Sequence, residues 1–117
     1  MSYALLVIEP PGQRRTRTDA EGREVYGRML RFGEDLKRRG LLTVSQSLKI
    51  GSADARVKMR EDAVVVTDGP FAEVKEVIGG FFLLTCETRE QAIEIARECP
   101  AAQWATVEVR ELGPCFA

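Results

Sequence analysis

The sequence predicts an α+β fold of the ferredoxin-like type: strands and helices in the order βαββαβ, with an antiparallel sheet and two helices on one of its faces. Apolar residues recur at helical spacing in two segments, 19–39 and 88–99. Elsewhere, β-branched and aromatic residues gather in short runs that Gly, Pro or Asp residues bound. With 117 residues, 44% of them hydrophobic, we expect residues 1–117 to form a single domain.

The first half of the chain contains one clear strand and one clear helix. Residues 3–9 are almost continuously apolar, which predicts a central strand, and a Pro-Pro-Gly run follows it. Asp19 is the expected N-cap of the first helix, and Gly40 is its expected stop. Over residues 41–48 the pattern weakens, and there we expect an irregular extended arm.

The second half predicts the remaining strands and the second helix. Residues 55–60 and 63–67 are expected to form a β-hairpin that turns at Glu61 and Asp62, which supplies the middle strands of a β-meander. Residues 77–86 form the longest strand candidate. A helix over residues 88–99 and a last strand over residues 104–111 complete the order.

The strand over residues 77–86 has apolar side chains on both faces. Alternation places Phe82 and Leu84 on one face and Phe81 and Leu83 on the other. Two helices cover only one face of such a sheet, so the other needs a partner. The sequence therefore predicts a homodimer packed sheet to sheet, a dimeric α+β barrel that closes a cavity. The Gly-Gly pair that follows Ile78 indicates a bulge or a close backbone approach there.

Missing residue types exclude several chemistries. The chain has no histidine, so it contains no Ser-His-Asp triad, no Cys-His dyad and no histidine-ligated metal. Its three cysteines lack metal or redox spacing; we expect Cys86 and Cys99 to be buried, reduced thiols and Cys115 to lie exposed in the tail. We therefore expect neither a metal nor an organic cofactor. Proton transfer would fall to a carboxylate, thiol, lysine or tyrosine.

Charge is unevenly placed along the chain. Residues 1–60 carry thirteen Lys and Arg against seven Asp and Glu, and residues 61–117 carry four against eleven. With an isoelectric point of about 5.6 and 7% aromatic residues, nucleic-acid binding is disfavoured. A local use is the cluster of Arg14, Arg15 and Arg17, which either holds a carboxylate or phosphate of a small ligand or is a solvated loop.

The hydropathy pattern also bears on location. The chain has no apolar run of the ~20 residues that span a bilayer, which excludes a membrane span. Its start lacks a basic region and runs directly into strand-like sequence. We therefore expect a cytoplasmic protein that makes no contact with a membrane.

One segment has the density of special residues that is typical of a motif. Residues 68–76 read D-G-P-F-A-E-V-K-E, and Gly79 and Gly80 follow before an apolar strand. This segment resembles the DGPF signature of the YCII-related family of small bacterial proteins. The C-P-A of residues 99–101 and the V-E-V-R of residues 107–110 agree with the later pattern of that family.

The resemblance covers nearly the whole chain and implies a single YCII-related (DGPF) domain that forms a dimeric α+β barrel. Members are regarded as enzymes or small-ligand binders, and some are encoded beside extracytoplasmic-function sigma factors. The wider superfamily includes a dehydrochlorinase that acts on a chlorinated hydroxyquinone. The YciI-like branch has a His-Asp pair, which this chain cannot form because it has no histidine.

Asp68 admits two interpretations. It is either a turn residue before Gly69 and Pro70, or a general acid or base in the dimer cavity, between Phe71 and Phe82, where burial would raise its pKa. In the second case a nearby cation would hold an oxyanion. The residues expected to bind the ligand are Arg14, Arg15, Arg60, Gly69, Pro70, Phe71, Lys75 and Phe82.

Two functions remain open at this point. The first is a cofactor-independent enzyme of the lyase, isomerase or dehydrochlorinase type that uses Asp68. The alternative is a non-catalytic module that binds a metabolite or a regulatory partner and is associated with sigma-factor signalling. In both cases we expect a small-molecule ligand and a homodimer.

Overall fold

The computed structural model describes residues 2–51, 53–71 and 74–116, so positions 72 and 73 of the DGPF motif lie outside the described residues. The elements follow the chain in this order: β1 (Ser2–Glu9), the 3-10 helix η1 (Gln13–Thr16), α1 (Asp19–Arg38), β2 (Leu42–Ser47), β3 (Ala55–Arg60), β4 (Ala63–Asp68), β5 (Val77–Thr85), α2 (Arg89–Glu98), the 3-10 helix η2 (Pro100–Gln103) and β6 (Thr106–Glu111).

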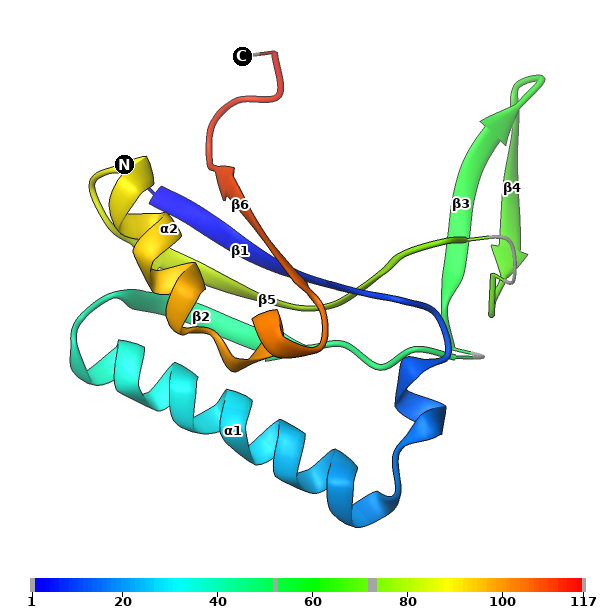
Figure 1. The fold of residues 1–117 in the computed structure, drawn as a ribbon. Helices are drawn as coiled ribbons and strands as arrows, with labels where there is room; N and C mark the ends of the chain where they lie inside the picture. The colour runs from blue at the N-terminus through cyan, green and yellow to red at the C-terminus, as the bar shows by residue number, and fades with distance from the viewer. Residues whose placement is uncertain (1, 52, 72–73, 117) are drawn as a thin grey trace.

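Four strands form an antiparallel sheet in the order β2-β5-β1-β6, and the two-stranded sheet β3-β4 stands apart from it (Figure 1). The register pairs Leu5 of β1 with Phe82 of β5 and with Val109 of β6. Buried side chains of both helices pack against the same face of the sheet. The predicted α+β fold with two helices on one face of an antiparallel sheet is confirmed.

The hydrophobic core lies between that face and the helices. Leu5, Leu36, Leu84 and Ile95 are its largest fully buried side chains, and they come from β1, α1, β5 and α2. The rings of Phe32 and Phe82 meet edge to face with their centroids 5.2 Å apart. Alternation along β1 and β5 thus directs one set of apolar side chains into the core.

Two expectations about the middle of the chain are wrong. Residues 41–48 do not form an irregular arm: they contain β2, an edge strand that pairs with β5. Its sequence, LTVSQS, is polar because one side of an edge strand faces solvent, so the strand pattern is weak. The hairpin β3-β4 does form, with Glu61 and Asp62 at positive φ in its turn, but it does not supply the middle strands of the four-stranded sheet.

Helix α1 begins one residue earlier than expected. Its N-cap is Thr18 instead of Asp19, and Thr18 forms a capping box with Glu21: each side chain accepts a hydrogen bond from the backbone N–H of the other residue. These hydrogen bonds lower the pKa of the Glu21 carboxyl. Gly40 follows the helix at φ +72°, where a glycine is favoured. In the described part of the chain, no helix is both long and apolar enough to cross a membrane.

The cysteines differ sharply in exposure, which gives a first prediction. Cys86 and Cys99 are buried, and burial raises the pKa of both thiols, whereas Cys115 is exposed. Because the thiolate is the reactive form, we expect an aromatic disulfide reagent to modify Cys115 quickly in the native protein and the other two only after unfolding. The measurement is a time course of thiol release at neutral pH. The variant Cys115→Ser should lose the fast phase, and three fast thiols in the native protein would contradict the prediction.

Candidate functional site

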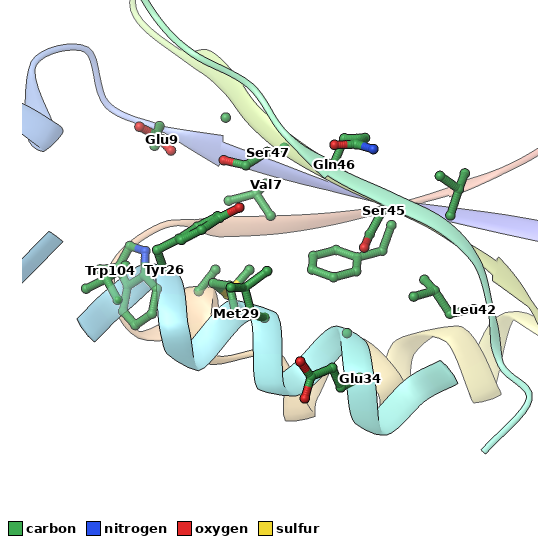
Figure 2. Close-up of a pocket in the computed structure, with 18 of the residues that line it drawn as sticks. Val7, Glu9, Tyr26, Met29, Glu34, Leu42, Ser45, Gln46, Ser47 and Trp104 are labelled. Atoms are coloured by element: carbon green, nitrogen blue, oxygen red, sulfur yellow. The ribbon is translucent and has the colours of Figure 1, made fainter. Parts of the chain in front are cut away.

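A cavity of about 570 Å³ lies between α1 and the helix-facing side of β1, β2 and β5 (Figure 2). This volume is in the range typical of small-molecule sites. Most of its wall is apolar and comes from five different parts of the chain; the principal apolar side chains are Val7, Val25, Met29, Leu42, Phe82 and Trp104.

The cavity exists because only the second half of α1 packs closely on the sheet. Phe32, Gly33 and Leu36 are the buried residues of the helix. Toward its N-terminus the helix is more open: Tyr26 is 51% exposed and Leu30, near the middle of the helix, is 48% exposed, although both line the cavity. Apolar side chains left this open beside a concave surface are typical of a ligand-binding site.

A partly buried ion pair lines one end of the cavity. Arg14 Nε donates to Glu9 Oε1 at 2.8 Å, and Arg14 Nη2 donates to Glu9 Oε2 at 3.3 Å. The Glu9 side chain is 7% exposed, and that of Arg14 is 37% exposed. Arg14 also donates from Nη1 to the carbonyl of Leu48 at 2.7 Å and from Nη2 to that of Gly79 at 3.1 Å. One guanidinium therefore connects β1, the segment after β2, and β5.

The Gly-Gly pair makes room for this ion pair. A Cβ on Gly79 would overlap the Glu9 carboxylate and lie 2.7 Å from Arg14 Nη2, and a Cβ on Gly80 would lie 3.0 Å from the carbonyl oxygen of Gln46. The β1-β5 register shifts between Val7 and Ile8, opposite Gly79. The bulge and the close approach predicted at this pair are both confirmed, and they lie where Gly79 and Gly80 line the cavity.

Aromatic and hydroxyl groups line the same end of the cavity. Figure 2 shows Tyr26 and Trp104 beside each other, with the Tyr26 hydroxyl directed toward the sheet. The guanidinium carbons of Arg17 and Arg28 lie 5.8 Å and 5.1 Å from the centroid of the Trp104 ring. Ser45 supplies a further hydroxyl from β2. These groups can contact a flat ring and hydrogen-bond its oxygen substituents.

The residue predicted to be catalytic and those predicted to bind a ligand lie in three places in the single chain. Arg14 and Phe82 line the cavity. Arg15 is exposed and its guanidinium lies near Gly12. The others belong to the hairpin or to the segment after it, away from the described cavity lining: Arg60, Asp68, Gly69, Pro70, Phe71 and Lys75.

The structure gives the start of the motif a clear local role. Asp68 ends β4 opposite Ala55 and is exposed. The N–H of Gly69 donates to the carbonyl of Asp54 at 2.6 Å, and a Cβ on Gly69 would lie only 2.9 Å from the Cβ of Asp54. Pro70 follows through a cis peptide bond, and the ring of Phe71 lies 3.9 Å from the guanidinium carbon of Arg56. These contacts close the base of the hairpin.

Sequence reasoning missed the central acid of the cavity. In the sequence, Glu9 ends an almost continuously apolar run, and its burial depends on a partner in the following loop. The signal was present: Glu9 continues the alternation of Tyr3, Leu5 and Val7, which face the helices, so its carboxylate should point inward. A buried carboxylate then requires a cation, which Arg14 supplies.

Together, the fold and the cavity define a ferredoxin-like α+β protein with a site of small-molecule size. The chain belongs to the YCII-related domain family, whose family model matches residues 1–115. An uncharacterized protein of Rhizobium meliloti (strain 1021) is 38% identical over 64 residues, which are 53% of this chain and 52% of that protein, so the match spans about half of the relative.

A solved structure supports the fold. The chain resembles 5-chloro-2-hydroxyhydroquinone dehydrochlorinase (TftG) from Burkholderia phenoliruptrix, which was solved in complex with 2,5-dihydroxybenzoquinone. The TM-score is 0.56 at 15% sequence identity, over 97% of this chain and 94% of that one. At this identity the likeness establishes the shared fold.

The glycine beside the ion pair gives a second prediction. We expect Gly79→Ala to lower the free energy of unfolding by about 1–3 kcal/mol, because the new Cβ displaces the Glu9 carboxylate and Arg14. The matched control is Gly113→Ala, where a Cβ meets nothing within 4 Å, so that its effect should stay within a few tenths of a kcal/mol. Urea unfolding measures both. Equal urea midpoints for the two variants would show that the space beside Gly79 does not contribute to the free energy of unfolding.

Proposed function

We propose that this YCII-related protein binds a small, largely apolar and ring-bearing ligand in the cavity between α1 and the sheet. The observation that carries the proposal is the cavity itself: about 570 Å³, walled mostly by apolar side chains and lined at one end by the Glu9–Arg14 pair. A fold without a ligand would gain stability by closing α1 onto the sheet, which would bury Tyr26 and Leu30.

The second candidate function is catalysis on that ligand, a cofactor-independent lyase, isomerase or dehydrochlorinase reaction. The likeness to TftG, solved with a dihydroxybenzoquinone, favours this class, and so does the presence of a carboxylate, a guanidinium and a tyrosine hydroxyl in one cavity. In such a reaction Glu9 accepts a proton from an activated carbon, while a cation stabilises the oxyanion that forms. The alternative stays a non-catalytic module that binds a metabolite or a regulatory partner.

Asp68 remains a candidate acid or base only in an assembly. It is exposed in the single chain and is not among the described residues that line the cavity. A partner subunit that covered the hairpin would enclose it. Catalysis by Asp68 therefore depends on the homodimer, whereas catalysis by Glu9 does not.

We propose in addition that the protein is a homodimer packed through the helix-free face of its sheet. Leu6, Ile8, Phe81 and Leu83 alternate with the core residues and lie half-buried on that face, beside Ile78, which is exposed. No described element of the same chain packs there, because both helices lie on the other face. A second copy of the sheet would remove these side chains from water.

The ligand site is tested with a cavity-filling variant. We expect dihydroxyquinones or aromatic acids to raise the melting temperature of the wild-type protein, because binding to the native state stabilises it by about 2.7 kcal/mol at 100 times Kd. The variant Gly33→Leu should abolish this shift, since Gly33 lines the cavity and a Cβ there has ordinary contacts with Phe82 and Ser45 at 3.6 Å. The measurement is a thermal-shift screen.

The matched control is Gly27→Leu, on the same helix but outside the described cavity lining. Both variants gain helix propensity of about 0.5–1 kcal/mol. If Gly33→Leu loses ligand binding and Gly27→Leu keeps it, the ligand therefore binds in the cavity. Turnover of each hit is then assayed in Glu9→Gln and Asp68→Asn. A shift that survives Gly33→Leu would place the ligand elsewhere and refute the site.

The dimer is tested by its mass. We expect light scattering to give twice the 13.0 kDa chain mass for the wild type and a monomer for Leu83→Lys, because a buried ammonium in the apolar sheet face disrupts packing. Phe116→Lys is the control, since it places the same charge on a side chain that is 90% exposed and lies outside both the sheet and the hairpin. A monomeric wild type at micromolar concentration would overturn the proposal, as would a dimer that Leu83→Lys leaves intact.

A further inference from the structure

We propose that the mouth of the cavity, at the N-terminal end of α1, is a subsite for an anionic group. The ligand would be an aromatic anion whose ring occupies the cavity and whose carboxylate, sulfonate or phosphate reaches Arg17 and Arg23. This inference rests on the proposed function, because it assigns a second part to the same ligand.

A shallow depression of about 340 Å³ adjoins the cavity at this point. Arg14, Arg17, Gly22 and Tyr26 line both of them, so the two spaces adjoin each other. Thr18, Asp19 and Arg23 complete the lining of the depression. The mouth of the cavity, on the side of this depression, therefore bears three arginines and one aspartate.

The three arginines are not equivalent. Arg14 donates to both carboxylate oxygens of Glu9 and to two backbone carbonyls, so its charge is already balanced inside the protein. For Arg17 and Arg23, the described residues provide no ion-pair partner within 4 Å. In the lining of the depression their two charges stand against the single charge of Asp19; the Glu21 carboxylate, whose pKa Arg17 helps to lower, is not part of that lining. Guanidinium groups bind carboxylates and phosphates with paired, charge-assisted hydrogen bonds.

The end of the helix itself is not the anion site. The capping box already satisfies the backbone N–H groups of Thr18 and Glu21, and the Glu21 carboxylate lies at the cap. Recognition of an anion thus falls to the arginine side chains.

The aromatic residues between the mouth and the cavity specify the other part of the ligand. Trp104 lines the cavity and has Arg17 at 5.8 Å from its ring, and Tyr26 lines both spaces. A flat ring that enters past these side chains stacks on them, while its anionic substituent stays at the arginines. An aromatic anion matches this arrangement, in which arginines lie at the mouth and aromatic side chains lie farther into the cavity.

The test compares two fluorescent probes of similar shape, 1-anilinonaphthalene-8-sulfonate and the uncharged N-phenyl-1-naphthylamine. Trp104 is the single tryptophan and lines the cavity, so energy transfer from it reports a bound probe, and loss of this transfer in Gly33→Leu assigns the probe to the cavity. We expect the double variant Arg17→Gln/Arg23→Gln to weaken the sulfonate probe about tenfold and to leave the uncharged probe unchanged.

The control is Arg31→Gln/Arg38→Gln, which removes the same charge from α1 at positions outside the described lining of both spaces. It should leave both affinities unchanged. If the cavity binds both probes and the Arg17/Arg23 variant changes neither affinity, or changes both equally, the anion subsite is refuted and the cavity stands. If neither probe shows transfer from Trp104, or if Gly33→Leu leaves transfer intact, the cavity proposal fails together with the subsite.

Discussion

The buried pair of Glu9 and Arg14 is the interaction on which the geometry of the site depends. A carboxylate that is 7% exposed requires a charged partner, because an uncompensated buried charge is strongly destabilising. Arg14 supplies it from the loop after β1 and uses its remaining donors on carbonyls of Leu48 and Gly79. Three chain segments far apart in sequence are thereby fixed at one end of the cavity. Gly79 and Gly80 are the residues that let them approach so closely.

This arrangement leaves apolar surface in two places that the single chain does not cover. One is the helix-free face of the main sheet. The other is the hairpin, where Val57 and Val66, and Met59 and Val64, form cross-strand pairs that are 58–69% exposed. A two-stranded hairpin is marginally stable by itself in water. The contacts of Gly69 with Asp54 and of Phe71 with Arg56 stabilise its base and leave its tip free.

Elements with a strong internal pattern could be predicted from the sequence, and those defined by a distant partner could not. The strand β1, both helices and the β3-β4 hairpin carry periodicity and turn signals of their own. The edge strand β2 is polar and is defined by its pairing with β5, so its sequence resembled a loop. Likewise, the inward position of the Glu9 carboxylate depends on its ion pair with Arg14, which the local sequence does not indicate. The special residues around Asp68 and Gly69, by contrast, indicate a local turn.

The same distinction separates scaffold from chemistry in this protein. In the described residues, the DGPF segment closes the base of the hairpin, and the Gly-Gly pair leaves space for an ion pair. Both roles depend on backbone conformation and on the absence of a Cβ at the glycines. The groups that a ligand in the cavity would meet come mainly from outside that segment, from α1, from the end of β1 and from Trp104. The DGPF segment and the Gly-Gly pair therefore shape the backbone around the hairpin and the cavity. The side chains that would select a ligand include Tyr26, which lines the cavity, and Arg17 and Arg23, which line the depression beside it; the fold places them there, and their own chemistry would decide what binds.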